Sequence, residues 1–239
     1  MKGIILAGGN GTRLRPLTLV TSKQLLPIYD QPMIYYPLET LRTAGITDIL
    51  IIVAPDHAGD FLKLLGSGKK FGCKFTYEIQ DEPAGLPQAF LIGENFIGSD
   101  NVTLILGDNI YEDNFSEAIK TFKTGGRVFI KQVPDPQRFG VAEFDENNKV
   151  VSIEEKPVQP KSNYSVTGLY IYDTSVIEKA KSLQPSSRGE LEITDLNNLY
   201  LKANQLDVAF VIGEWFDTGT FESLHDAITF VRAKKLQQP

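Results

Sequence analysis

The sequence has few of the residues on which several classes of protein depend. It contains one cysteine, Cys73, and two histidines, His57 and His225, among 239 residues. One cysteine excludes an internal disulfide framework and a cysteine-based zinc site, and two histidines exclude a histidine-rich metal site. No apolar run approaches the length that crosses a bilayer, so we expect no membrane association. Glycines and then Arg13 and Arg15 follow the short apolar N-terminus, which is typical of a first strand and its loop and not of a signal peptide.

Positive charge is also in short supply. The chain carries 24 Lys and Arg against 30 Asp and Glu, a formal net charge of -6. Binding to the backbone of nucleic acids depends on clustered Lys and Arg, so this balance argues against a nucleic-acid partner. With 42% hydrophobic residues and this length, the chain can bury a full core. We expect a globular protein of a reducing compartment, the cytoplasm.

The first half of the chain alternates short β-branched runs with amphipathic stretches. Strands are predicted at 3–6, 49–53 and 102–106, and helices at 33–44 and 86–95, with Gly45 as a stop signal. This order predicts a parallel sheet with right-handed crossovers and helices on both faces.

The second half has a different pattern. Strands are expected at 127–133, 140–144, 150–155 and 165–172 with no long helix between them, which favours antiparallel or mixed pairing. Further helices are predicted at 174–183, 193–203 and 220–235, and a further strand at 208–212. No linker or repeat divides the chain, so we predict a single domain over residues 1–239, with halves at 1–126 and 127–239.

The strongest motif begins in the first predicted strand. Gly8, Gly9 and Gly11 lie in the loop that follows it, and Arg13 and Lys23 come next. Glycines let backbone N–H groups approach phosphate oxygens closely, and the two cations can neutralise a polyphosphate. Three alternatives compete with one another. The loop lacks the third glycine of a Rossmann dinucleotide fingerprint and the Gly-Lys-Ser/Thr ending of a Walker loop. The third alternative is a plain glycine turn with surface charges. The density of glycines with two cations favours phosphate binding.

Two aspartates follow predicted strands. Asp108 comes after the strand at 102–106, and Asp217 after the apolar strand at 208–212. Open α/β sheets bind ligands at the carboxyl ends of their strands, and carboxylate oxygens suit Mg²⁺. An isolated aspartate at such a place is more often a turn or helix-cap residue.

An ordered series of motifs resembles the sugar-phosphate nucleotidyltransferases, most closely their branch that makes dTDP-glucose. The series runs over nearly the whole chain as GGNGTRLRPLT, SKQLLP, GLPQA, LGDN, RFGV, EEKP, TGLY, RGELEIT and WFDTGT. The resemblance implies a Rossmann-like three-layer α/β fold with a mixed, mainly parallel central sheet. It also implies a nucleotide-binding first half and a sugar-phosphate-binding second half.

The resemblance implies a reaction of dTTP with glucose 1-phosphate that gives dTDP-glucose and pyrophosphate, with Mg²⁺ as cofactor. Arg13, Lys23 and Asp108 are the implied catalytic residues, and Asp108 and Asp217 the implied metal ligands. The implied nucleotide-binding residues are Leu6, Gly8, Gly9, Gly11, Thr12, Arg13, Gln24, Gln80, Gly85 and Asp108. Gln80 and the backbone of Gly85 would recognise the base, since an amide can both donate to and accept from its edge.

The implied sugar-phosphate residues are Asn109, Gly140, Glu155, Lys156, Val166, Tyr170 and Arg188. Without the resemblance, the Glu-Glu-Lys run would be taken for a solvated charge cluster. Pro87 departs from the usual alanine of GLPQA, and we expect little effect because proline is tolerated in the first turn of a helix. Such proteins are commonly assembled from identical subunits, so a homodimer or homotetramer is expected.

The residues leave four alternatives open. They are UTP in place of dTTP, another sugar 1-phosphate, a non-catalytic regulator that binds sugar nucleotides, and a nicotinamide oxidoreductase. One methyl group separates thymine from uracil, and a pocket can use it for only ~1–3 kcal/mol. Many longer relatives carry a helical C-terminal extension that helps to form an allosteric site for dTDP-rhamnose. The sequence given ends after the helix that follows Asp217, so we expect weak or absent feedback of that kind.

Overall fold

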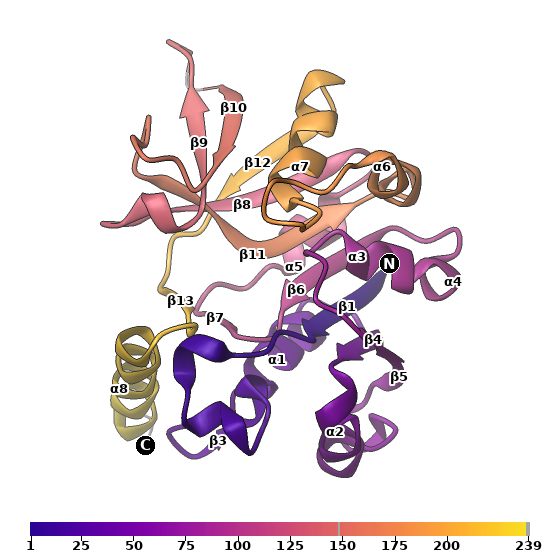
Figure 1. Cartoon of the computed structure of the whole chain (residues 1–239), viewed down its shortest axis with the longest axis vertical. Helices are drawn as coiled ribbons and strands as arrows, with labels where there is room; N and C mark the ends of the chain where they lie inside the picture. Colours follow the sequence, from indigo (N-terminus) through magenta and orange to yellow (C-terminus); the bar gives the residue numbers. More distant parts are fainter. Residues whose placement is uncertain (148, 238–239) are drawn as a thin grey trace. The chain divides into compact units, whose positions relative to one another are not determined.

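The computed structural model describes residues 1–147 and 149–237. The chain divides into two compact units that are each assembled from segments far apart in the sequence (Figure 1). Unit 1 comprises Met1–Lys2, Ala84–Leu104 and Ala118–Ile212, and unit 2 comprises Gly3–Pro83, Ile105–Glu117 and Gly213–Pro239. This division does not follow the expected halves at 1–126 and 127–239, and the single-domain organisation stays a prediction.

Three neighbouring strands of unit 2 pair in parallel. β1 (Lys2–Ala7) pairs with β4 (Asp48–Val53), with Ile5 opposite Ile51, and β4 pairs with β5 (Lys74–Ile79). The apolar residues of β1 and β4 are buried on both faces, as in parallel strands that lie between layers of helices. The strands expected at 3–6 and 49–53 are confirmed.

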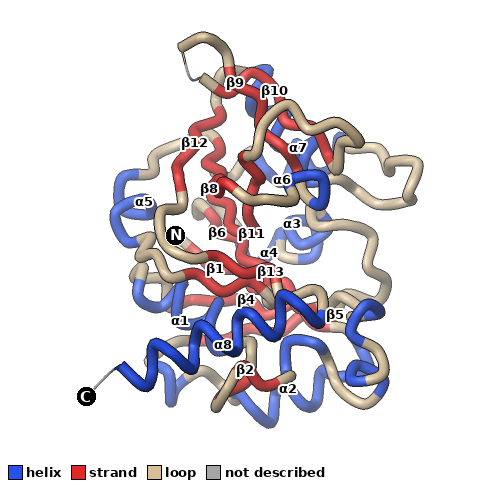
Figure 2. Tube along the Cα trace, turned by 90° about the vertical axis from the view of Figure 1, so that its left-hand side faces the viewer, coloured by secondary structure: helices blue, strands red, loops and turns tan. Residues whose placement is uncertain are grey.

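The helices of unit 2 are α1 (Tyr35–Thr43), α2 (Ala58–Leu65) and α8 (Phe221–Gln237). The expected helix at 33–44 is confirmed, although its regular part begins two residues later. It ends just before Gly45, whose φ of 85° lies in the left-handed region that glycine adopts without a steric penalty. Figure 2 shows α8 as the longest helix of this unit.

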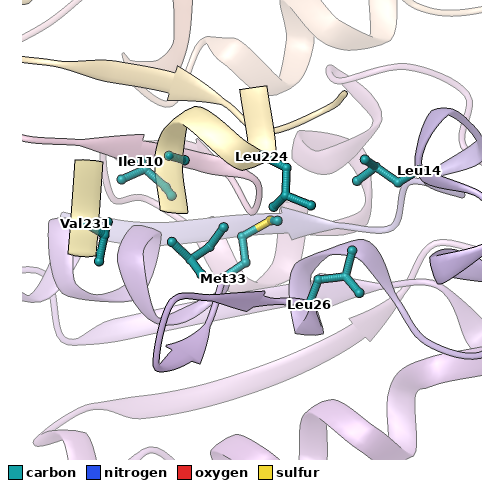
Figure 3. Packing of buried hydrophobic residues seen from close by; sticks show 8 residues of the cluster. Leu14, Leu26, Met33, Ile110, Leu224 and Val231 are labelled. Atoms are coloured by element: carbon teal, nitrogen blue, oxygen red, sulfur yellow. The ribbon is translucent and has the colours of Figure 1, made fainter. Parts of the chain in front are cut away.

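A hydrophobic cluster in unit 2 anchors the two segments that carry Arg13 and Lys23. α8 contributes residues at helical spacing, and the segments next to the two cations contribute Leu14 and Leu26 (Figure 3). The buried members are Leu14, Leu26, Ile28, Met33, Ile110, Leu224, Ala227 and Val231. Because each fully buried aliphatic side chain stabilises the fold by about 1.5–3 kcal/mol, this cluster fixes the backbone on which the cations are mounted.

Two short antiparallel strands in unit 2 correct one expectation. β7 (Asn109–Tyr111) pairs with β13 (Trp215–Asp217). Asp217 is therefore the last residue of its own strand. It was expected to follow the strand at 208–212, which the structure places in unit 1 as β12 (Leu206–Phe210). A second pair, β2 (Pro27–Ile28) and β3 (Gln31–Pro32), forms a small hairpin.

The sheet of unit 1 is mixed, as expected. β11 (Tyr164–Tyr172) pairs antiparallel with β8 (Gly126–Gln132) and β9 (Gly140–Phe144), and β9 pairs antiparallel with β10 (Val150–Glu155). β12 adds a parallel partner to β8. In Figure 2, β8 and β11 run side by side. The expected fold class, α/β with a mixed, mainly parallel sheet and flanking helices, is confirmed.

Unit 1 contains α3 (Gln88–Ile92), α4 (Glu94–Ile97), α6 (Val176–Ser182) and α7 (Ile193–Lys202). The continuous helix expected at 86–95 is wrong, because Gly93 separates α3 from α4. Glycine loses more conformational entropy in a helix than any other residue and exposes the backbone, which explains a break there. β6 (Val102–Leu106) and α5 (Ser116–Thr121) each cross the boundary between the units.

Candidate active site

The loop after β1 has the geometry of an anion-binding loop. Gly11 has φ of 59°, and the Thr18 hydroxyl donates to its carbonyl oxygen at 2.7 Å. A Cβ atom at Gly11 would lie 2.9 Å from Thr18 Cγ2 and 3.2 Å from Lys23 Cβ, so only glycine brings this backbone so close to Lys23. Within residues 1–147 and 149–237, the backbone N–H groups of 9–12 donate no hydrogen bond. They are therefore available to an anion.

Two glutamines lie against this loop and its sheet. A Cβ atom at Gly8 would lie 2.2 Å from Gln80 Oε1, so the Gln80 side chain occupies the space that Gly8 leaves open. Gln24 is 3% exposed, its Oε1 accepts from the Ser22 hydroxyl at 2.7 Å, and it packs on Gly107. The N–H of Gly107 donates to the carbonyl of Leu6 at 2.9 Å. Unit 2 thus brings together Leu6, Gly8, Gln24 and Gln80.

Lys23 and Asp108 form an ion pair in which both side chains are largely buried, 11% and 13% exposed. Burial raises the pKa of Asp108, but the attraction of Lys23 and hydrogen bonds from Lys23 and Asn109 outweigh it, so the pKa lies below its usual value. Asn109 Nδ2 donates to Asp108 Oδ1 at 3.1 Å. Asp108 is therefore an ionised carboxylate at neutral pH.

The strand pair β7–β13 brings the backbone around Asp217 next to that of Asp108. Asp217 faces Asn109 across the pair, and Thr218 donates to the backbone oxygen of Asp108 through its hydroxyl at 2.7 Å and its N–H at 3.1 Å. Asp217 Oδ1 accepts from the N–H of Gly219 at 3.0 Å. The backbones of the two aspartates are thereby held close together although they are far apart in sequence.

Arg13, in the loop after β1, extends toward Gly219 and Asp217. A Cβ atom at Gly219 would lie 2.6 Å from Arg13 Nη2 and 2.8 Å from Asp217 Oδ1. The absence of a side chain at Gly219 lets the guanidinium approach the aspartate. Arg13 is exposed and makes no hydrogen bond within the described part of the chain, so its five donors are available to a ligand.

The donors present fit a divalent cation that keeps part of its hydration shell. No group of three or more His, Cys, Asp or Glu side chains among the described residues could hold a metal ion. Mg²⁺ is usually bound through only one or two carboxylates, with water and phosphate oxygens completing its shell. Asp108 and Asp217 match that requirement, and a cage of protein ligands is not needed.

Unit 1 gathers a second set of the residues expected to form the site. Glu155, at the end of β10, faces Gly140 of β9, and the Thr194 hydroxyl donates to Glu155 Oε2 at 2.6 Å. A Cβ atom at Gly140 would lie 2.9 Å from Thr194 Oγ1. Lys156 Nζ lies 3.4 Å from Glu155 Oε1. The φ of 45° at Lys156 is unusual for a residue other than glycine and turns the chain sharply after the strand.

Arg188 belongs to the same set. Its Nε and Nη2 donate to the carboxylate of Glu192 at 3.2 and 2.7 Å, and Nη2 lies 3.4 Å from Glu155 Oε1. Glu192 also accepts from the Ser186 hydroxyl at 2.5 Å. Burial raises the pKa of Glu192, but the bonds from Arg188 and Ser186 and the charges of Arg188 and Lys156 outweigh it, so the pKa is lowered.

Four further residues of the expected sugar and base sites are held by other contacts. Gly85, with φ of 103°, forms a β-bridge with Leu191. Val166 and Tyr170 are buried in β11, 7% and 3% exposed, and the Tyr170 ring stacks on Tyr172 with centroids 6.2 Å apart. Asn109, expected to contact sugar, is in unit 2 beside Asp108. The functional roles of these residues stay predictions.

Comparison with known proteins gives the family. The chain matches the nucleotidyl transferase family over residues 2–234. The chain belongs to the nucleotidyl transferase family. A glucose-1-phosphate thymidylyltransferase of Neisseria meningitidis serogroup A is 57% identical over 97% of this chain and 83% of its own length. The enzyme of that name from Mycolicibacterium smegmatis is 54% identical over 100% and 84%.

Solved structures agree with this assignment. A Bacillus anthracis protein assigned as a glucose-1-phosphate thymidylyltransferase, crystallised with sucrose, has a TM-score of 0.93 and 49% identity, covering 97% of this chain and 95% of its own. A UDP-glucose pyrophosphorylase in complex with UDP-glucose has a TM-score of 0.85 and 25% identity, covering 98% of each. This nucleotidyltransferase chain is therefore an enzyme of the class expected from its motifs. No helix among its described residues is long and apolar enough for a bilayer span.

The structure of this nucleotidyltransferase adds contacts that the motifs did not single out. Glu192 and Thr194 lie within the RGELEIT motif but carried no expected role. Arg188 and Glu192 both lie before α7 begins at Ile193, so the rule that pairs residues four apart in a helix does not predict their contact. Thr218, 0% exposed, joins Asp217 to Asp108, and only its place inside WFDTGT pointed to it. Gly219 marks the closest approach of Arg13, which no sequence pattern reveals.

Proposed function

We propose that the chain transfers a thymidylyl group from dTTP to α-D-glucose 1-phosphate, which yields dTDP-glucose and pyrophosphate. The single observation that carries this proposal is the buried Lys23–Asp108 pair beside Asp217 and Arg13 in a family member that is 50–58% identical to glucose-1-phosphate thymidylyltransferases. A non-catalytic relative would have lost one of these charged groups. A cytoplasmic location and a homo-oligomeric state, dimer or tetramer, are part of the proposal.

The sugar-phosphate oxygen attacks the α-phosphorus in line, and pyrophosphate leaves from the opposite side. The nucleophile is already an anion, so no strong base is required. The main obstacle is repulsion between two polyanions, which positioning and electrostatic stabilisation must overcome. The backbone N–H groups of residues 9–12 donate hydrogen bonds to phosphate oxygens. Arg13 and Lys23 balance the negative charge that builds up on the α-phosphate and the leaving group.

Asp108 and Asp217 would hold Mg²⁺, in keeping with a family that is generally dependent on divalent metals. When bound, the ion neutralises phosphate charge and orients the reacting oxygens. Lys23 already neutralises Asp108 in the structure, so it is positioned to share that carboxylate or to turn toward phosphate.

Base and sugar are recognised by neutral and charged groups respectively. The Gln80 amide, lying against Gly8, and the backbone of Gly85 pair with the edge of thymine. Glu155 accepts hydrogen bonds from sugar hydroxyls, and Lys156 and Arg188 hold the 1-phosphate. Gly140 leaves room for the hexose.

The competing substrate is UTP, because the UDP-glucose pyrophosphorylase has the same fold. Its 25% identity, against 57% for the thymidylyltransferase of Neisseria meningitidis, favours dTTP. The test is a matrix of nucleoside triphosphates against sugar 1-phosphates, with pyrophosphate release as the readout. The highest kcat/KM is expected for dTTP with glucose 1-phosphate, and a preference for another pair would replace these substrates.

A further inference from the structure

One short segment of unit 1 contacts three residues of the proposed site. We call Leu191-Glu192-Ile193-Thr194 the LEIT segment; it leads into the first turn of α7. Its members touch Gly85, Arg188 and Glu155 through one backbone pairing and two side-chain contacts. Neither Glu192 nor Thr194 has a role in the proposed function so far.

The first contact holds Ala84 and Gly85, which we call the base-side loop because Gly85 is proposed to recognise the base. The Leu191 N–H donates to the carbonyl of Ala84 at 2.9 Å, and Leu191 forms a β-bridge with Gly85. A Cβ atom at Gly85 would lie 2.0 Å from the carbonyl oxygen of Leu191. The two backbones are therefore packed as closely as glycine allows, and the position of Gly85 depends on Leu191.

The second contact orients Arg188. Glu192 is 8% exposed, and its two carboxylate oxygens accept hydrogen bonds from Nε and Nη2 of Arg188 in a forked arrangement. A forked pair fixes the plane of the guanidinium as well as its distance. Nη1 donates to no residue in the described ranges 1–147 and 149–237, so this corner of the guanidinium is available to a phosphate oxygen.

The third contact orients Glu155. Thr194 is 4% exposed, and its hydroxyl donates to Glu155 Oε2 at 2.6 Å. The same hydroxyl lies where a Cβ atom at Gly140 would meet it at 2.9 Å. One oxygen of Glu155 is thus occupied by Thr194, and the other faces Arg188 and Lys156.

We propose that Glu192 and Thr194 are positioning residues for the sugar phosphate. Glu192 acts through Arg188 and Thr194 acts through Glu155, while Leu191 ties both to the base-side loop. This inference rests on the proposed function, because it assigns glucose 1-phosphate to Arg188 and Glu155. It predicts that a change at Glu192 affects the sugar phosphate and leaves the nucleotide nearly untouched.

The test compares Glu192→Gln with Asp195→Asn. Both remove one carboxylate charge, but Asp195 is exposed in the first turn of α7 and makes no side-chain hydrogen bond to a described residue. A glutamine cannot accept from both arms of the fork, so E192Q is expected to raise KM for glucose 1-phosphate about tenfold. KM for dTTP should change less than about twofold, and D195N should match the wild type.

A double-mutant cycle with Arg188→Ala separates positioning from a general structural role. If Glu192 acts through Arg188, E192Q adds less than about a twofold change once Arg188 is gone. Thr194→Val should raise KM for the sugar phosphate, and Thr194→Ser should restore it. An unchanged KM in E192Q, an equal rise for both substrates, or a full additional effect in the R188A background would overturn the inference.

The wild-type control distinguishes this inference from the function on which it rests. Wild-type enzyme that releases no pyrophosphate from dTTP and glucose 1-phosphate contradicts the proposed function. Calorimetric binding of glucose 1-phosphate to wild type, E192Q and D195N then judges the positioning directly. A tenfold loss confined to E192Q supports it, and equal affinities or no binding to the wild type would refute it.

Discussion

Lys23 and Asp108 form a largely buried ion pair although they lie 85 positions apart in the chain. The cation comes from a 3-10 turn that the hydrophobic cluster of unit 2 anchors, and the carboxylate comes from the turn between β6 and β7. Each charge makes the burial of the other tolerable, so their energies are coupled. The pair therefore links the stability of unit 2 to the proposed chemistry.

The first prediction concerns this coupling. Lys23→Met leaves an unpaired, buried carboxylate and should cost about 2–4 kcal/mol of unfolding free energy. Adding Asp108→Asn should recover at least ~1 kcal/mol, because the unpaired charge is then gone. Urea unfolding of both single variants and the double variant measures the coupling.

The control is Lys161→Met, whose ion pair with Glu143 is exposed and should be worth less than about 1 kcal/mol. Additive losses at Lys23 and Asp108 would show that they are independent.

The second prediction tests Gln80 as the base-recognising residue. Gly8→Ala would place a methyl group 2.2 Å from Gln80 Oε1 and must displace that side chain. Gly59→Ala in α2 is the matched control, because no atom lies within 4 Å of the added Cβ and Gly59 has no role in the proposed site. We expect G8A to raise KM for dTTP by about tenfold or more and to weaken discrimination between bases, and G59A to leave it nearly unchanged. Equal effects of G8A and G59A on steady-state KM values would count against Gln80.

The third prediction concerns the bridge between Gly85 and Leu191. Gly85→Ala adds both a strained positive φ and a clash with backbone that cannot move aside easily. Gly72→Ala shares the positive φ, at 70°, but has nothing within 4 Å of the added Cβ. The strain alone costs about 1 kcal/mol, so thermal and urea unfolding should show G72A mildly destabilised and G85A losing about 2–4 kcal/mol or more. Similar losses of unfolding free energy in G85A and G72A would mean that the backbone around Gly85 moves easily to accommodate the added methyl group.

The fourth prediction is a pH dependence of stability in unit 1. The Asp173 carboxylate accepts from the Gly125 N–H at 2.7 Å, from the Thr124 hydroxyl at 2.8 Å and from the Ser175 hydroxyl at 2.6 Å. Burial raises its pKa, but these hydrogen bonds outweigh burial and lower it. A lowered folded-state pKa gives stability that is present above the unfolded value and lost as pH falls through the folded one.

Asp173→Asn should therefore cost about 1–3 kcal/mol at pH 7, and the difference from wild type should shrink below about pH 4. Urea unfolding of D173N and the wild type at pH 7 and below about pH 4 measures this difference in unfolding free energy. Asp226→Asn is the control, since Asp226 is exposed on α8 and has no polar partner among the described residues. A D173N deficit that does not depend on pH would show that the ionised carboxylate is not the source of the stability.

Much of the fold could be predicted because its signals are local. The strands at 3–6, 49–53 and 102–106 are predominantly apolar runs, as expected for burial on both faces of a parallel strand. β5 was not predicted because it mixes buried and exposed positions without a clear apolar run. β13 is only three residues long and carries too little pattern to be separated from the loop around it.

The candidate site is marked in the sequence by glycines, cations and ordered motifs, as at Gly8, Arg13 and Lys23, and the roles of these residues stay predictions. Contacts that depend on register could not be predicted. The backbones of Asp217 and Asp108 lie close together because β13 pairs with β7, and the Glu192 carboxylate binds Arg188 because of the turn before α7. Such partners are fixed by tertiary packing, and no spacing in the sequence encodes them.

The most direct measurement is the product analysis of one reaction, with dTTP, glucose 1-phosphate and Mg²⁺ supplied to wild type, Asp108→Asn and Arg13→Ala. Wild type should form dTDP-glucose and pyrophosphate in equal amounts. Both variants should remain folded by circular dichroism and lose turnover by about two orders of magnitude or more, because each removes charge stabilisation at the reacting phosphates. A wild type that forms no dTDP-glucose, or either variant at near-normal turnover, would contradict the proposed thymidylyl transfer at this site.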